Sequence, residues 1–150
     1  MNDRHAELTI LLVEDDDVAA EAVVRSLGKA QLMFPVVWAE HGEQALNALR
    51  GLDPRRPVPR PRVTLLDLNM PRMNGFEFLD WLRSVPDLLR SIVFVFTTSE
   101  AQFDRDLAYD RQVAGYLAKP RLGPGYADLV PFLTIFSRDV SFPPPITACA

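Results

Sequence analysis

The sequence predicts an α/β fold, a doubly wound five-stranded parallel sheet covered by helices on both faces. Two observations support this prediction. Short apolar runs rich in Val, Ile, Leu and Phe recur along the 150 residues, and segments with helical spacing separate them. Such alternation gives (βα)5, with parallel strands joined by right-handed crossovers. We therefore expect a ligand site at the carboxyl ends of the strands.

Five apolar runs are the predicted strands. They are LTILLV (8–13), PVVWA (35–39), VTLLDL (63–68), SIVFVFT (91–97) and AGYLA (114–118). Most of them are too continuous for strands with one exposed face, which favours a sheet buried on both sides. The second and fifth runs give the weaker signal.

Helical spacing fills the intervals between these runs. It is predicted over 17–29, 42–50, 74–82, 100–112 and 126–138. The apolar residues expected on the buried helix faces are Val18, Ala22, Val23, Leu27, Ala30, Ala45, Leu46, Leu49, Phe76, Leu79, Leu82, Phe103, Leu107, Leu129, Phe132, Leu133 and Phe136.

Two stretches lie outside the alternation. Residues 53–62, DPRRPVPRPR, hold four prolines and four arginines and predict an extended, solvated loop with polyproline character. We favour a surface insertion over a partner-docking segment. The end of the chain, SFPPPITACA, contains three consecutive prolines and is expected to be an arm or disordered. The expected organisation is a single domain over 1–140 with a tail over 141–150.

Composition excludes several classes of function. The net charge of −4, from 16 basic and 20 acidic residues, gives no basic footprint for nucleic acid or an anionic membrane. A single cysteine, Cys149, cannot form an intrachain disulfide. The apolar run at 8–13 is too short for a transmembrane helix or a signal peptide. We expect a cytoplasmic protein that binds neither nucleic acid nor a membrane.

Polar side chains follow the predicted strands at their carboxyl ends. They are Glu14 and Asp15 after the first strand, Asp67 at the end of the third, Thr97 and Thr98 at the fourth, and Lys119 and Pro120 after the fifth. Each alone has an ordinary explanation as a helix cap or a surface residue. Parallel strands, however, bring all of them to one edge of the sheet.

The charges at this edge predict a cation. Two carboxylates about 4 Å apart repel by roughly 4 kcal/mol at an effective dielectric near 20, and one lysine cannot neutralise two or three acids. Either one carboxyl group stays protonated or a cation binds there. Oxygen ligands without His or Cys suit Mg²⁺, which takes one or two carboxylates together with phosphate oxygens.

The remaining groups suit a phosphoryl ligand. Lys119 can pair with one anionic oxygen, and the Thr97 hydroxyl can donate to another. A carboxylate in line with such a group can act as a nucleophile and become an aspartyl phosphate. Asp67 is the candidate because it ends the strand expected to be most buried, where its position is fixed.

Four motifs in this order, LLVEDD, LLDLNMPRMNG, FVFTTS and GYLAKP, resemble the receiver domain of two-component response regulators. The resemblance covers about residues 8–137 and implies the flavodoxin-like strand order 2-1-3-4-5. It implies that Asp67 accepts a phosphoryl group from a phosphohistidine on a sensor histidine kinase. Mg²⁺ is implied to be held by Glu14, Asp15, Asp67 and the backbone carbonyl of Asn69.

The same resemblance implies a switch. Lys119 would bind the phosphoryl group, and Thr97 would move toward it together with Tyr116. Thr98 is larger than the residue common at its place in the family and would restrict access to the phosphoryl group. Structural roles are implied for Pro71 and Gly75, which turn the chain after the acceptor, and for Pro120, whose bond to Lys119 is cis in the family.

Two alternatives compete with a phosphorylated switch. Haloacid-dehalogenase-like phosphatases also form an aspartyl phosphate, but they need an acid two residues after the nucleophile, and here that residue is Asn69, which cannot shuttle a proton. The other alternative is a scaffold of the same fold that works without phosphorylation. We expect no enzyme beyond self-phosphorylation and slow self-dephosphorylation.

The expected partners follow from the same resemblance. Only 31 residues follow Lys119, so we expect a stand-alone receiver that signals through protein contacts to a downstream protein or phosphotransfer partner. Among such receivers the sequence is most similar to regulators paired with bacterial phytochrome kinases. Apolar residues beyond those needed for the core, Ile135 above all, either cover the edge of the sheet or form a partner surface, and we expect a homodimer through the faces of the fourth and fifth helices.

Overall fold

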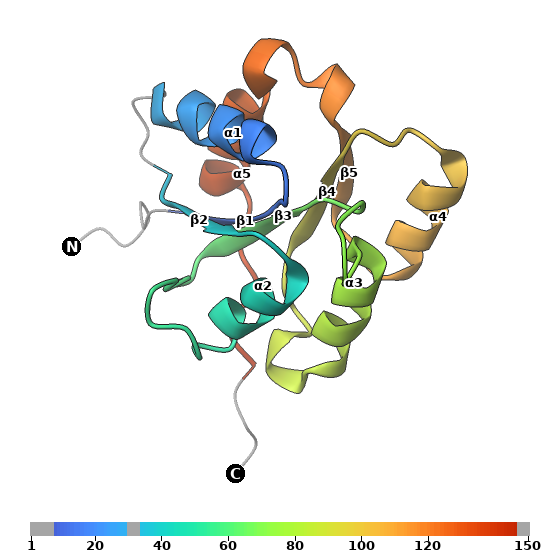
Figure 1. Cartoon of the computed structure of the whole chain (residues 1–150). Coiled ribbons are helices and arrows are strands. Elements are labelled where there is room, and N and C mark those ends of the chain that lie inside the picture. The colour runs from blue at the N-terminus through green and yellow to red at the C-terminus, as the bar shows by residue number, and fades with distance from the viewer. Residues whose placement is uncertain (1–7, 30–33, 147–150) are drawn as a thin grey trace, which may run out of the picture.

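Five parallel strands form the centre of the molecule (Figure 1). They are β1 (Thr9–Val13), β2 (Val36–Ala39), β3 (Arg62–Leu66), β4 (Val93–Thr97) and β5 (Gly115–Ala118). Their order in the sheet is β2-β1-β3-β4-β5, as the sequence predicts. The computed structural model describes residues 8–29 and 34–146. In the central register, Leu12 lies between Trp38 of β2 and Leu65 of β3.

Five helices cover the two faces of the sheet. They are α1 (Asp17–Lys29), α2 (Gly42–Leu49), α3 (Gly75–Ser84), α4 (Gln102–Asp110) and α5 (Leu129–Asp139). Figure 1 shows α1 and α5 on one face and α2, α3 and α4 on the other. Short 3-10 turns lie at Pro86–Leu88, Lys119–Arg121 and Pro124–Tyr126. No helix among the described residues is both long enough and apolar enough to cross a membrane.

The sheet separates two apolar cores. Successive side chains of a strand point to opposite faces, so Leu11 packs with Phe78 of α3, while Ile10 packs with Leu133 of α5. Every residue of β1 is buried. Each large apolar side chain that is fully buried contributes roughly 1.5–3 kcal/mol to folding, so the central strands are held firmly from both sides.

Two residues predicted on buried helix faces need correction, although Val23 and Leu27, predicted on the same face as Val18, are buried. Val18 and Phe103 are 75% and 71% exposed, whereas the buried residues on their helices include Val23 and Ala108. Each exposed residue lies five positions before the buried one, which places it roughly 140° away around a helix of 3.6 residues per turn. Ala30 lies outside the described residues.

The loop of residues 53–62 is docked on the sheet more closely than predicted. The side chain of Val58 is buried, and the Arg56 Nε donates to the Trp38 carbonyl at 3.1 Å. The Arg56 guanidinium also pairs with Asp53 at 2.7 Å. The loop is therefore attached to β2 instead of being solvated along its whole length.

The start of the tail crosses the body of the molecule as an arm. The Phe142 ring packs edge-on against Phe136 of α5, with centroids 5.4 Å apart, and Arg90 donates to the Pro144 carbonyl at 3.2 Å. These contacts attach residues 142–144 to the body. Residues 147–150 of the predicted tail lie outside the described part of the chain.

The expected cis bond between Lys119 and Pro120 is not found. Among the described residues the cis peptide bond joins Arg60 and Pro61. The two isomers of a bond before proline differ by only about 0.5–1 kcal/mol, so the motif alone does not determine which isomer is present.

Candidate functional site

Four strands bring the predicted site residues to one edge of the sheet. Glu14 and Asp15 directly follow β1, Asp67 follows β3, Thr97 is the last residue of β4, and Lys119 follows β5. Glu14, Asp67, Thr97 and Lys119 are all buried, and Asp15 is exposed. Buried polar groups in a row at strand ends are unusual in an apolar fold, because each one loses its hydration.

Three carboxyl groups converge at this edge. One oxygen from each of Glu14, Asp15 and Asp67 lies within 4.8 Å of the other two. The backbone at the two strand ends is fixed, because the Asp67 amide donates to the Val13 carbonyl at 3.1 Å. The cluster therefore presents three anionic oxygens at a spacing that a single cation can bridge.

Lys119 lies against two of the three acids. Its Nζ is 2.6 Å from Glu14 Oε1 and 3.8 Å from Asp67 Oδ2. The same ammonium lies 4.9 Å from the centre of the Phe96 ring, a cation–π contact. One positive charge thus faces three carboxyl groups, which leaves a negative excess at the site.

The pKa values follow from burial and from this crowding. Desolvation raises the pKa of Glu14 to about 7, and the charge of Asp67 adds to the increase while Lys119 opposes it. For Lys119, burial lowers the pKa, but the hydrogen bond with Glu14 and the charges of Asp67 and Glu14 outweigh burial, so its pKa is raised. Lys119 therefore stays charged, and Glu14 ionises only at a cost.

The hydroxyl groups of Thr97 and Tyr116 differ in their bonding. The Thr97 hydroxyl oxygen is buried and has no hydrogen-bond partner among the described residues. The Tyr116 hydroxyl donates to the Ser99 carbonyl at 2.9 Å, which ties β5 to the loop after β4. Thr98 is exposed beside Thr97. An unsatisfied buried hydroxyl costs free energy and is available to a ligand with acceptor oxygens.

The loop after Asp67 is shaped by Gly75. A Cβ atom added at Gly75 would lie 2.7 Å from the Asp67 carbonyl oxygen, so any side chain there would displace the loop. Between these residues the Asn69 amide donates to Asp67 Oδ1 at 3.4 Å, while Asn69 and Pro71 are exposed. Gly75 also begins α3, and the turn predicted for Pro71 and Gly75 leads directly into that helix.

Two residues of the site were not anticipated from the sequence. The Trp38 indole Nε1 donates to the Glu14 carbonyl at 2.7 Å and so holds the loop after β1. Phe96 carries the ring under Lys119. Both lie inside apolar runs, where an aromatic residue is most simply predicted to belong to the core. Their place at the site depends on how neighbouring strands are aligned in the sheet.

The donor set fits a hard divalent cation. Carboxylate oxygens are ligands that Mg²⁺ and Mn²⁺ accept, and no His or Cys belongs to the acidic cluster among the described residues. A bound cation would offset the negative excess, and acceptor oxygens on a further ligand would satisfy the Thr97 hydroxyl.

An α/β domain with a buried acid and a lysine at the strand ends, beside a hydroxyl without a partner, is a candidate phosphoryl-binding domain. Residues 10–123 match the family model described as the response regulator receiver domain, and the chain belongs to that family. Receiver domains bind a divalent metal and are phosphorylated by histidine kinases.

The relatives include regulators associated with phytochromes. Response regulator Rcp1 from Synechocystis sp. is 35% identical over 112 residues, which is 75% of this chain and 76% of Rcp1. The crystal structure of its Mn²⁺-bound form covers 91% of this chain and 99% of that one, with a TM-score of 0.77 and 31% identity. The crystal structure of the phosphorylated cyanobacterial phytochrome response regulator RcpA matches with a TM-score of 0.79 and 30% identity. The match covers 93% of this chain and 100% of RcpA.

Proposed function

We propose that this receiver domain is a Mg²⁺-dependent switch that takes a phosphoryl group on Asp67 from a sensor histidine kinase. The observation that carries the proposal is the arrangement around Asp67. Its carboxylate lies within 4.8 Å of two further acids and 3.8 Å from the Lys119 ammonium. A nucleophile, a cation site and a positive charge for the phosphoryl oxygens are therefore in reach of one another.

The proposed reaction is an in-line displacement. An Asp67 carboxylate oxygen attacks phosphorus, the P–N bond to the kinase histidine breaks with its electron pair leaving on the imidazole, and a P–O bond forms. Glu14 and Asp15 would hold Mg²⁺ together with Asp67 and the Asn69 carbonyl. The cation, when bound, offsets the charge that develops on the phosphoryl oxygens.

The chain's own residues would then respond to the new group. Lys119 exchanges part of its contact with Glu14 for a phosphoryl oxygen, and the Thr97 hydroxyl gains the acceptor that it lacks among the described residues. The Tyr116 hydroxyl, bonded to the Ser99 carbonyl, links this change to the loop before α4. A ligand that interacts with one arrangement of this loop more strongly than with another shifts its population.

Labelling tests the acceptor. Incubation with a radiolabelled acyl phosphate and Mg²⁺ is expected to label the protein through an acid-stable, alkali-labile bond, and Asp67→Asn is expected to abolish labelling. Asp87→Asn, an exposed acid in the turn after α3, is the matched control and should label like the wild type. Equal labelling of the Asp67 variant would refute the proposal and favour a scaffold that works without phosphorylation.

The phytochrome-associated relatives support a phytochrome-type histidine kinase as the phosphoryl donor. We expect such a kinase to transfer its phosphoryl group to this protein much faster than unrelated kinases do. Comparison of several purified, phosphorylated kinases from one organism over a time course tests this. Faster transfer from a kinase without a phytochrome sensor would refute the assignment while leaving Asp67 as the acceptor.

We also propose a homodimer formed through the faces of α4 and α5. Ile135 of α5 and Tyr109 of α4 are 53% and 51% exposed, and such side chains gain most when they are buried against a second copy. Mass measurement in solution at micromolar concentration, with and without a beryllofluoride phosphoryl mimic, tests the proposal. Ile135→Glu is expected to give a monomer, and a monomeric wild type in both conditions would refute it.

A further inference from the structure

A cavity lies at the end of the sheet opposite to Asp67. It measures about 230 Å³ and lies at the start of β3 and just before β4, where Arg62, Ser91 and Ile92 contribute to its wall. Strands rise about 3.3 Å per residue, so the length of the five-residue strand β3 places this cavity roughly 17 Å from Asp67, which follows the other end of that strand. It is a separate place on the molecule.

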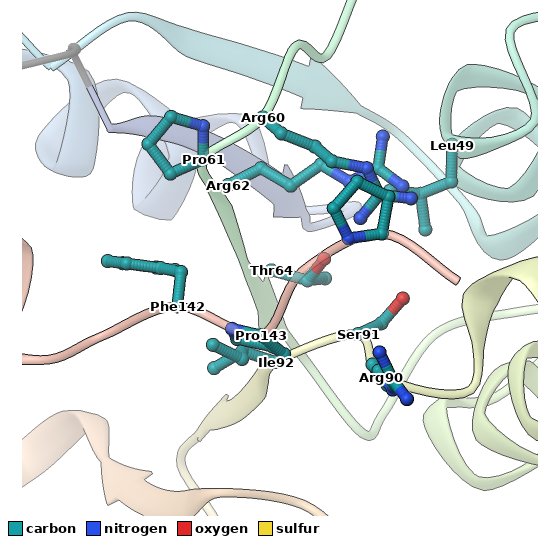
Figure 2. A pocket seen from close by; sticks show the side chains of 11 residues that line it. Leu49, Arg60, Pro61, Arg62, Thr64, Arg90, Ser91, Ile92, Phe142 and Pro143 are labelled. Carbon is teal, nitrogen blue, oxygen red and sulfur yellow. The ribbon is translucent and has the colours of Figure 1, made fainter. Parts of the chain in front are cut away.

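The cavity combines an apolar wall with positive charge (Figure 2). Leu49 of α2, Ile92 and the arm residues Phe142, Pro143 and Pro145 form the apolar part. Arg60, Arg62 and Arg90 also line the cavity, together with Pro61, Thr64 and Ser91, and no acidic residue in the described part of the chain does so. Figure 2 shows the nitrogen-bearing ends of Arg60 and Arg62 next to each other beside Leu49.

Of these arginines, Arg62 is half-buried, and Arg60 and Arg90 are exposed. Arg62 donates to the Val58 carbonyl at 2.9 Å and Arg90 to the Pro144 carbonyl, but within the described residues none of the three forms a salt bridge. Burial and the nearby charge of Arg60 lower the pKa of Arg62 to about 10. Two adjacent guanidinium groups without a counter-ion repel each other, and an anion between them would offset both charges.

We propose that this cavity binds a small organic carboxylate with a short apolar body. The carboxylate would accept hydrogen bonds from Arg60 and Arg62, and the apolar body would lie against Leu49, Ile92 and Phe142. The volume is below the roughly 300–1,000 Å³ of sites for drug-sized ligands, so the ligand is small. Because the arm forms one wall, binding also holds the arm on the body of the protein.

Hexanoate and 1-hexanol form a matched pair of probes, since they share the apolar body and differ in charge. The full chain, labelled with ¹⁵N, is titrated with each while amide shifts are recorded. Hexanoate is expected to shift the amides of Leu49, Arg62, Ile92 and Phe142 saturably and to leave that of Asp67 unchanged. Hexanol is expected to bind at least about tenfold more weakly, because it cannot accept charge-assisted bonds from two guanidinium groups.

Arginine variants distinguish recognition of the carboxylate from non-specific apolar binding. Arg60→Gln, at an exposed position, and Arg62→Gln are each expected to weaken hexanoate binding about tenfold and to leave hexanol binding unchanged. Arg25→Gln, an exposed arginine on α1, is the control and should bind like the wild type. Should Arg62→Gln fail to fold, Arg60→Gln still tests the proposal. Equal affinity for both probes, unchanged binding in the folded arginine variants, or no saturation at millimolar hexanoate would overturn it.

Discussion

Glu14→Gln is expected to stabilise the metal-free protein at pH 8. The structure buries the Glu14 carboxyl among Asp67, Asp15 and Lys119, which raises its pKa from 4.5 to about 7. At about 1.4 kcal/mol per pKa unit, the ionised carboxyl costs the folded state roughly 3 kcal/mol. Glutamine removes that cost because it is uncharged, and its side chain has nearly the same shape as that of glutamate. We expect a gain of about 1–3 kcal/mol, the lower figures allowing for the weakened contact with Lys119.

The pH dependence has a definite sign. The pKa of Glu14 is higher in the folded protein than in the unfolded chain, so the folded state binds the extra proton between about 4.5 and 7. The penalty is therefore absent below about pH 4.5, grows as the pH rises to about 7, and stays constant above it. The advantage of Glu14→Gln should follow the same course.

Urea unfolding at several pH values, in the presence of a chelator, measures this difference. Glu21→Gln, an exposed acid on α1, is the control and should change the free energy of unfolding by less than about 0.5 kcal/mol. Added Mg²⁺ is expected to stabilise the wild type and to shrink the difference, because the cation neutralises the same charges. A Glu14→Gln protein that is less stable than the wild type at pH 8, or an advantage of equal size at pH 4.5, would refute the electrostatic reasoning.

Three further substitutions test the packing that holds the site, with the free energy of unfolding in urea as the common measurement. Phe78→Ala removes a fully buried ring from α3 and should cost about 3–5 kcal/mol, whereas Phe103→Ala, at a 71% exposed position, should change little. Asn74→Ala breaks the capping box at the start of α3 and should cost about 1 kcal/mol; no loss would mean that the cap is redundant. Arg83→Ala removes the guanidinium that donates to the carbonyls of Leu89, Ser91, Arg111 and Gln112. We expect the free energy of unfolding to fall by roughly 2–3 kcal/mol. A loss below about 0.5 kcal/mol would show that water replaces the guanidinium.

Strand positions could be predicted from the sequence because buried parallel strands need continuous apolar runs. The run ending at Asp67 and the run ending at Thr97 each become a strand that stops at the polar residue or just before it. Once parallel strands are accepted, their carboxyl ends must share an edge. The site residues were therefore predictable as a group from chain order alone.

Helix phase was harder to predict where apolar residues are sparse. Val18 and Phe103 are large and apolar, but Ala19 and Ala108 are buried instead. A small residue suits the close approach of a helix to the sheet, and the sequence pattern gives a large side chain more weight than an alanine. Hydrophobicity alone therefore misplaced Val18 and Phe103, although Val23 and Leu27, predicted on the same face of α1 as Val18, are buried.

Contacts between distant segments could not be predicted from composition. The Pro- and Arg-rich stretch reads as a surface loop, yet Arg56 bonds to Trp38, and Arg60 and Arg62 line a cavity together with the arm. These contacts depend on which strand ends lie next to each other in space. Local sequence does not contain that information for a loop without periodicity.

The hydrogen bond from Trp38 to the Glu14 carbonyl has a practical consequence. The sequence contains two tryptophans, and the other, Trp81, is 53% exposed on α3. In a Trp81→Phe protein, all tryptophan emission would come from an indole whose N–H is bonded to the main chain of an acidic-cluster residue. Movement of that residue on metal binding or phosphorylation would change the emission. The chain thus carries its own optical probe, placed within 2.7 Å of the Glu14 carbonyl.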